Sequence, residues 1–120
     1  SLKVYGHGKQ TRTFCYITDA IVGFLTILIE GSEPNVYNVG NPTPEISITE
    51  LAKLVREILN EDIAIETIQY PETYPEDEPN RRCPDISRIA STFNYKPEVT
   101  LKAGLARFFT WVRENYPALI

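Results

Sequence analysis

The residues that point most directly to a fold lie at 10–31 and read QTRTFCYITDAIVGFLTILIEG. In the first part, residues 10–17, polar side chains alternate with apolar or aromatic ones, which is typical of a half-buried strand. Asp19 stands where a helix N-cap is expected, and Gly31 stands where a left-handed residue would end the helix. Between them, residues 20–30 are apolar on nearly every side, which predicts a helix covered on more than one face.

Helix and strand signals alternate along the rest of the chain. The clearest is a capping box at Ser47 and Glu50, whose side chains can each bond the other residue's backbone amide, and Thr100 is expected to cap the last helix. Strands are predicted for residues 35–40 and 62–70, and helices for residues 48–60, 86–93 and 101–116. Residues 70–82 are rich in proline and acidic side chains and predict a loop. This order predicts an α/β fold of mixed short strands and about four helices.

The composition is that of an ordinary globular protein and excludes several classes of function. The 120 residues have room for one domain or part of a larger one, with 42% apolar and 23% charged residues. A formal charge of -4 argues against partners such as nucleic acid or an anionic membrane, because both need a basic footprint. Cys15 and Cys83 stand too far apart in sequence for a zinc signature or a disulfide framework. We therefore expect a cytoplasmic protein.

Two short motifs near the N-terminus suggest chemistry, and local glycines argue against both. Tyr5 and Lys9 have a Tyr-x-x-x-Lys spacing that acts as a catalytic pair only on a helix. Gly6 and Gly8 interrupt that spacing and predict a tight turn, in which His7 would be a loop residue. The two glycines also lack the third glycine of a dinucleotide-binding turn. No catalytic residue, metal ligand set or cofactor site is predicted within the chain.

Arginine is the remaining candidate for a binding role. Arg12 lies within the predicted strand, and Arg81 and Arg82 follow the acidic loop. Guanidinium groups from separate segments can clamp one diphosphate, because their paired donors match its oxygens. The alternative is ion pairing with the many carboxylates of this acidic chain, and the residues alone favour that alternative.

The whole chain resembles the C-terminal part of extended short-chain dehydrogenase/reductases, in particular the NAD-dependent epimerases and dehydratases of nucleotide sugars and, among them, UDP-glucuronate decarboxylases. The blocks that carry the resemblance, in family order and spacing, are VYGHGKQTRTFCYITD (residues 4–19), YNVGNP (37–42), ISITELA (46–52), DEPNRRCPDIS (77–87) and YKPEVTLKAGL (95–105). With this resemblance, paired arginines on a diphosphate become the preferred interpretation.

The resemblance implies a binding site for a UDP-sugar. The implied residues are Arg12 and Arg82 for the diphosphate, Ile48 for the uracil or ribose, Asp85 for the ribose hydroxyls, and Gln10 and Phe14 for the wall beside the nucleotide. These roles agree with the chemistry, because a carboxylate accepts from hydroxyls and an aliphatic side chain can cover a base. For Asp85, a helix N-cap role is weighed equally and could coexist with ribose binding.

Family members carry an NAD-binding turn and a helical Tyr-x-x-x-Lys pair in a longer N-terminal part, and the sequence contains neither. The resemblance therefore implies a substrate-binding portion without the main Rossmann core, inactive alone, whose NAD is bound by the rest of the parent polypeptide. Residues 19–40 are expected to pack on that NAD domain. In the parent, NAD would transiently oxidise sugar C4 before epimerisation, elimination or decarboxylation.

Two other interpretations stay open at this point. The chain could be a free-standing, non-catalytic binding module, since its helices carry their own caps. Exposed apolar surface could also drive self-association into a homodimer by exchange of residues 20–40 between chains.

Overall fold

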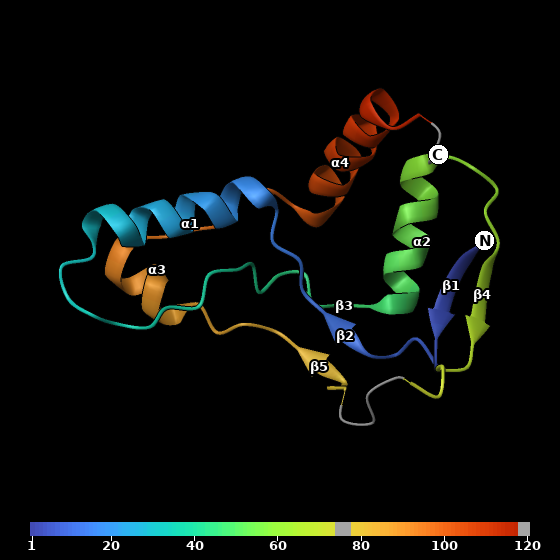
Figure 1. The fold of residues 1–120 in the computed structure, drawn as a ribbon, viewed down its shortest axis with the longest axis horizontal. Coiled ribbons are helices and arrows are strands. Elements are labelled where there is room, and N and C mark those ends of the chain that lie inside the picture. The colour runs from blue at the N-terminus through green and yellow to red at the C-terminus, as the bar shows by residue number, and fades with distance from the viewer. Residues whose placement is uncertain (74–77, 118–120) are drawn as a thin grey trace.

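The computed structural model describes residues 1–73 and 78–117. Its strands are β1 (Leu2–Tyr5), β2 (Thr11–Arg12), β3 (Ile46–Ser47), β4 (Ile65–Ile68) and β5 (Arg81–Arg82), and its helices are α1 (Ile17–Glu30), α2 (Ile48–Leu59), α3 (Ser87–Phe93) and α4 (Leu101–Asn115). This mixture of short strands and four helices confirms the predicted α/β class (Figure 1). Among the described residues, no helix combines the length and the apolarity needed to span a bilayer.

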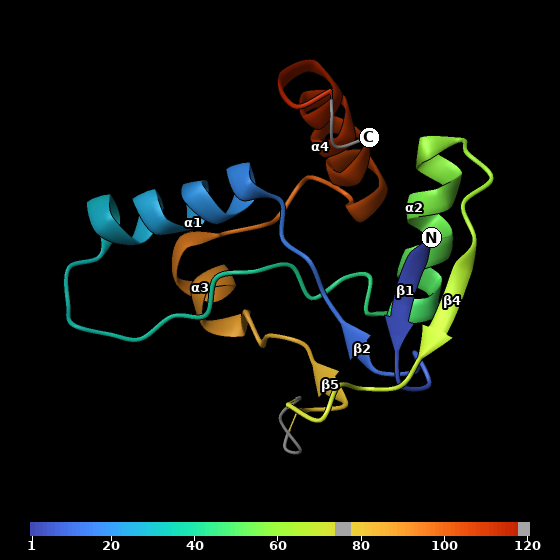
Figure 2. The ribbon, with the colours of Figure 1, turned by 45° about the vertical axis from the view of Figure 1, so that its right-hand side comes forward.

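Two groups of elements lie at opposite ends of the molecule, and both ribbon views show them apart (Figures 1 and 2). At one end α2 packs on β1 and on α4, and β1 pairs with β4 in parallel. At the other end α1 packs on α3. The core side chains of the first group are Val4, Ala52, Leu59, Leu101 and Val112, and those of the second are Ile89 and Tyr95. A small sheet in the order β3-β2-β5 lies between the groups.

The structure corrects two strand predictions and one loop prediction. The strand predicted for residues 10–17 is only two residues long, because α1 already begins at Ile17. Residues 35–40 form no strand; a strand needs a partner for its backbone groups, and none of the described strands pairs with them. β5 lies inside the predicted loop, where it pairs in parallel with β2. β1 was not predicted at all.

The start and the end of α1 also differ from the prediction. Asp19 is not the N-cap: that position belongs to Tyr16, which makes no side-chain capping bond. The Asp19 carboxylate is buried within the first turn, where it accepts the N–H of Val99 at 3.0 Å. Gly31 is extended, with φ -69° and ψ 115°, rather than left-handed, and its N–H donates to the Ile27 carbonyl.

The predicted caps of α2 and α4 are confirmed. The Glu50 N–H donates to Ser47 Oγ at 3.2 Å, and the Ser47 N–H donates to Glu50 Oε2 at 2.9 Å, which completes the capping box. Thr100 Oγ1 accepts the N–H of Ala103 at 3.3 Å at the start of α4. These bonds satisfy amide groups that the first helical turn cannot pair internally.

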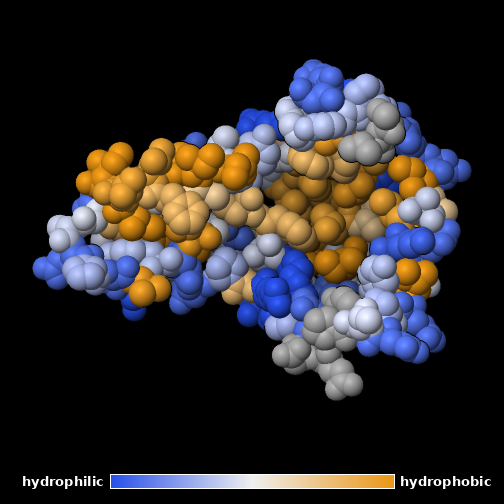
Figure 3. Space-filling view, in the orientation of Figure 1, coloured by the Kyte–Doolittle hydropathy of each residue, from blue (hydrophilic) through white to orange (hydrophobic). Residues whose placement is uncertain are grey.

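The apolar side chains of α1 are exposed, although the sequence predicts that they are covered on more than one face. Only Asp19 and Gly23 are buried on this helix. Its exposed large apolar residues are Ile17, Ile21, Val22, Phe24, Leu25, Leu28 and Ile29. Figure 3 shows them as one apolar face over α1, and further apolar surface appears beneath α4. The described residues therefore leave this helix uncovered.

Candidate functional site

Strand pairing brings Arg12 and Arg82 side by side. The two residues are direct partners in the parallel register of β2 and β5, although 70 positions separate them in sequence. Thr11 and Arg81 form the neighbouring pair. Because successive side chains of a strand point to opposite faces, Arg12 and Arg82 share one face and Thr11 and Arg81 share the other.

The two arginines of the first face converge on one carboxylate. Arg12 Nη2 lies 2.5 Å from Glu78 Oε1, and Arg82 Nη2 lies 3.2 Å from Glu78 Oε2. The side chain of Arg12 is only 15% exposed, whereas that of Arg82 is 59% exposed. Arg12 Nη1 also donates to the Thr11 carbonyl at 2.8 Å. Two guanidinium groups from separate segments thus contact a single anion within this chain.

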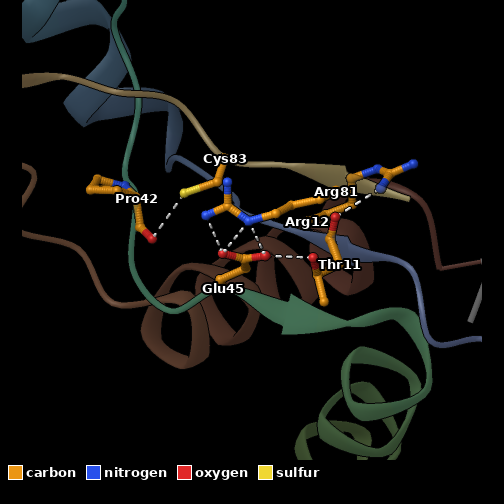
Figure 4. Close-up of polar contacts among 6 residues, drawn as sticks. All are labelled: Thr11, Arg12, Pro42, Glu45, Arg81 and Cys83. Atoms are coloured by element: carbon orange, nitrogen blue, oxygen red, sulfur yellow. Dashed lines mark hydrogen bonds and ion pairs between the residues drawn. The ribbon is translucent and has the colours of Figure 1, made fainter. Parts of the chain in front are cut away.

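Glu45 holds the opposite face of the small sheet together. Arg81 donates to both of its oxygens, with Nη2 at 2.8 Å from Oε2 and Nε at 3.0 Å from Oε1. The Thr11 hydroxyl donates to Glu45 Oε1 at 2.5 Å. The hydrogen bond from Thr11 and the Arg81 guanidinium lower the pKa of the Glu45 carboxyl. Figure 4 shows Arg81 directed toward Glu45 while Arg12 points away from it, so that Glu45 positions β5 against β2. No motif or spacing in the sequence points to Glu45.

An open pocket of about 600 Å³ lies against the arginines. Its lining residues are Arg12, Thr13, Cys15, Val39, Gly40, Asn41, Arg81, Arg82, Cys83 and Pro84, and we call it the arginine pocket. Gly40 lets the chain pass close to Pro84, since a Cβ at this position would lie 3.0 Å from the proline Cγ. The Cys83 thiol points to the Pro42 carbonyl (Figure 4). The other cysteine of the pocket is Cys15, and burial raises the pKa of its thiol. The pocket therefore joins three arginines to a wall of small and apolar residues.

The other predicted site residues do not line this pocket. Gln10 is buried, and its Nε2 donates to the Tyr5 carbonyl at 3.2 Å, while its Oε1 has no partner among the described residues. Ile48 is half-buried at the start of α2, where its N–H donates to the Gln10 carbonyl. Phe14 lines a separate apolar pocket of about 250 Å³ between the start of α1 and α4.

Asp85 is engaged at the start of α3. Its Oδ1 accepts the N–H of Ser87 at 2.9 Å and the Ser87 hydroxyl at 2.5 Å. These bonds lower the pKa of the Asp85 carboxyl. The N-cap residue of α3 is Ile86 rather than Asp85. Asp85 lies one residue before the N-cap, and its carboxylate accepts the N–H of Ser87, the first residue of the helix. The side chain remains exposed to solvent.

The turn after β1 has the conformation that its glycines predict. Gly6 and Gly8 have φ of 63° and 64°, and no helix joins Tyr5 to Lys9. A Cβ on Gly6 would collide with the Tyr70 ring, and one on Gly8 with Thr49. These glycines therefore serve close packing and lead into β2.

The described residues do not fit a dinucleotide cofactor. None of their glycine-rich turns leads from a strand into a helix N-terminus, which is the arrangement that cradles a dinucleotide pyrophosphate. Within the same ranges, no three His, Cys, Asp or Glu side chains gather where they could hold a metal ion.

Relatives of this chain are enzymes of nucleotide sugars. Residues 1–40 match the NAD dependent epimerase/dehydratase family. UDP-glucuronic acid decarboxylase 1 of Arabidopsis thaliana is 40% identical over 114 residues, which cover 95% of this chain and 25% of that protein. The dTDP-D-glucose 4,6-dehydratase of Homo sapiens is 32% identical over 115 residues, which cover 94% of this chain and 33% of that protein.

Solved structures with a similar fold include a dehydratase and an epimerase. A dTDP-glucose 4,6-dehydratase from Streptomyces venezuelae with NAD bound has a TM-score of 0.83 at 25% identity, over 98% of this chain and 35% of that one. A UDP-glucuronic acid 4-epimerase from Bacillus cereus, in complex with UDP-glucuronic acid and NAD, has a TM-score of 0.78 at 27% identity, over 95% and 35%.

The chain thus spans between a quarter and about a third of the length of these relatives. Its sequence matches theirs over nearly all of its own residues, and its fold superimposes on part of theirs. Sequence and fold therefore make this chain similar to part of an extended short-chain dehydrogenase/reductase: residues 1–40 match the NAD dependent epimerase/dehydratase family, and nearly the whole chain resembles the UDP-glucuronic acid decarboxylases.

Proposed function

We propose that this chain binds the diphosphate of a nucleotide sugar, most simply a UDP-sugar, for an NAD-dependent epimerase, dehydratase or decarboxylase. The arginine pair, Arg12 and Arg82, would contact the diphosphate oxygens. The observation that carries the proposal is the convergence of both guanidinium groups on one carboxylate of this chain, at Glu78. A diphosphate offers the same kind of acceptor with more negative charge.

The role of the chain in the reaction is to hold and orient the substrate. Two guanidinium groups on neighbouring strands fix the diphosphate, and with it the direction in which the sugar leaves the pocket. Asp85 would accept from the ribose hydroxyls, and Ile48 would cover the base or ribose. Gln10 and Phe14 complete the proposed set as residues of the wall beside the nucleotide.

The redox step belongs to a part of the enzyme outside this chain. NAD would accept hydride from the sugar, and the described residues offer it no pyrophosphate cradle. We therefore propose that the rest of the parent polypeptide binds NAD, and that the 120 residues alone do not turn over UDP-glucuronic acid in the presence of NAD. Turnover by the rigorously purified 120-residue chain would refute that part of the proposal.

Removing either arginine should weaken binding of UDP to the full-length enzyme. Arg12→Ala and Arg82→Ala each delete a charged hydrogen-bond donor, which costs about 2 kcal/mol, or roughly thirtyfold in Kd. Isothermal titration calorimetry with UDP measures the effect. Arg56→Ala is the matched control, because Arg56 is an exposed arginine on α2 outside the pocket. If both pocket variants bind UDP as the wild type does, the diphosphate assignment is wrong.

We also propose that residues 19–40 pack on the NAD-binding domain of the same polypeptide. Support comes from the row of exposed apolar side chains on α1, which a soluble protein rarely leaves in water. The alternative is a free-standing module that self-associates through the same face. In either case the exposed face of α1 favours an apolar partner. The stability of a full-length variant with a charge on this face distinguishes packing on the same polypeptide from self-association.

A further inference from the structure

Glu78 occupies the position that the proposed function assigns to the substrate diphosphate. Each of its two oxygens accepts from one member of the arginine pair. We infer that Glu78 is an internal anion that competes with the nucleotide diphosphate, and that its carboxylate must leave Arg12 when substrate binds. This inference rests on the proposed function and adds a residue that sets the affinity of the site.

Arg12 has little room for a second anion while Glu78 is in place. Both terminal nitrogens of its guanidinium already donate, Nη1 to the Thr11 carbonyl and Nη2 to Glu78. The side chain is 15% exposed, so most of the group is covered by protein. These bonds use two of the five N–H donors of the guanidinium, and a diphosphate that takes the Nη2 donor displaces Glu78.

Arg82 is the member of the pair that a ligand can reach first. Its side chain is 59% exposed, and its contact with Glu78 is longer, 3.2 Å against 2.5 Å for Arg12. A diphosphate can thus bind Arg82 from solvent and then exchange with the carboxylate at Arg12. Binding would proceed in two steps, first at Arg82 and then at Arg12.

The positive charges of Arg12 and Arg82 explain how Glu78 stabilises the free protein and why it lowers affinity for a diphosphate. Arg12 and Arg82 are neighbours on adjacent strands, and two like charges at this separation repel each other. Glu78 reduces their combined charge from two positive charges to one. The same negative charge repels an incoming diphosphate, so Glu78 stabilises the free protein and weakens binding.

The variant Glu78→Gln tests this balance, because it keeps the shape of the side chain and removes its charge. We expect the full-length enzyme with this change to bind UDP and inorganic pyrophosphate about fivefold more tightly, the equivalent of one partly exposed ion pair. Binding of uridine, which lacks phosphate, should not change. The melting temperature without ligand should fall. Glu57→Gln is the control, since Glu57 pairs with Lys102 on the surface, outside the arginine pocket.

Combining Glu78→Gln with Arg12→Ala tests whether Glu78 lowers UDP affinity by competing for Arg12. In the Arg12→Ala background, Glu78→Gln should raise UDP affinity by a smaller factor than it does in the wild type, because one of the two donors for which Glu78 competes is gone. Unchanged or weaker UDP binding by Glu78→Gln overturns the inference. In that case a loss of affinity in Arg12→Ala and Arg82→Ala still supports the proposed function, whereas normal binding by both of those variants overturns the proposed function itself.

Discussion

At the scale of single residues, Asp19 shows how one buried side chain can join distant parts of the chain. Its carboxylate accepts the N–H of Val99 at 3.0 Å, and its backbone oxygen accepts the Tyr95 hydroxyl at 3.2 Å. Burial raises the pKa of Tyr95, so the phenol remains a hydrogen-bond donor. Asp19 therefore fixes the start of α1 to the segment that leads into α4.

Removing the Asp19 carboxylate should destabilise the protein. In Asp19→Ala the Val99 amide loses its acceptor in a partly buried position, which costs about 1–3 kcal/mol in the free energy of unfolding. Urea denaturation measures the change. Asp62→Ala removes an exposed carboxylate and should stay within about 0.5 kcal/mol of the wild type. Equal stability of Asp19→Ala and the wild type would show that this bond contributes nothing.

At the scale of secondary-structure elements, the small sheet depends entirely on pairing between distant segments. Strands of two residues have almost no stability of their own, and the sheet order β3-β2-β5 joins residues from positions 11, 46 and 81 onward. Glu45 and the capping box at Ser47 flank β3 and fix its ends. The relative positions of Arg12 and Arg82 thus follow from contacts made by other residues.

The cap of α2 should contribute measurably to stability. Ser47→Ala removes the acceptor for the Glu50 amide and should lower the free energy of unfolding by about 1 kcal/mol. Ser32→Ala, an exposed serine in the connection after α1, is the control. Thermal denaturation of both variants measures the difference. An equal loss in both would mean that the capping box has no specific effect.

The contribution of this capping box to stability should decrease at low pH. Hydrogen bonds from the Ser47 hydroxyl and amide lower the pKa of the Glu50 carboxyl in the folded protein. The stabilisation is therefore present above the unfolded pKa of about 4.3 and is lost as pH falls through the lower folded pKa. The difference in stability between the wild type and Ser47→Ala should narrow below about pH 4. A difference that stays constant to lower pH would contradict a role for the ionised Glu50.

The elements that could be predicted from the sequence are those whose signals are local. The capping box spans four residues, and α2 and α4 show apolar side chains at helical spacing, so their ends were predicted to within one residue. The pairing of β2 with β5 has no local signal, and residues 35–40 show a strand pattern without a partner among the described strands. The arginine pair was suggested by residue chemistry and family resemblance, whereas no sequence pattern indicates its contact with Glu78.

At the scale of the whole molecule, the arginine pocket lies beside the small sheet, between the two groups of elements. The small sheet connects the end formed by α1 and α3 with the end formed by α2 and α4 (Figures 1 and 2). The exposed apolar face of α1 (Figure 3) shares none of its residues with the arginine pocket. A domain that covered α1 would lie on the same chain as the proposed diphosphate site, as the proposed packing of an NAD-binding domain requires.

A charge on the apolar face of α1 should test what covers it. Leu28 is 77% exposed, so Leu28→Asp costs the isolated chain little and should make it more soluble. In the full-length enzyme the same change would place a carboxylate in an apolar interface and should lower the melting temperature by several degrees. Ala106→Asp, at an exposed position on α4, controls for the added charge. If Leu28→Asp leaves the full-length enzyme as stable as Ala106→Asp does, α1 is not covered by the same polypeptide. In that case, sedimentation that shows a dimer of the wild-type chain and a monomer of Leu28→Asp would favour self-association through this helix instead.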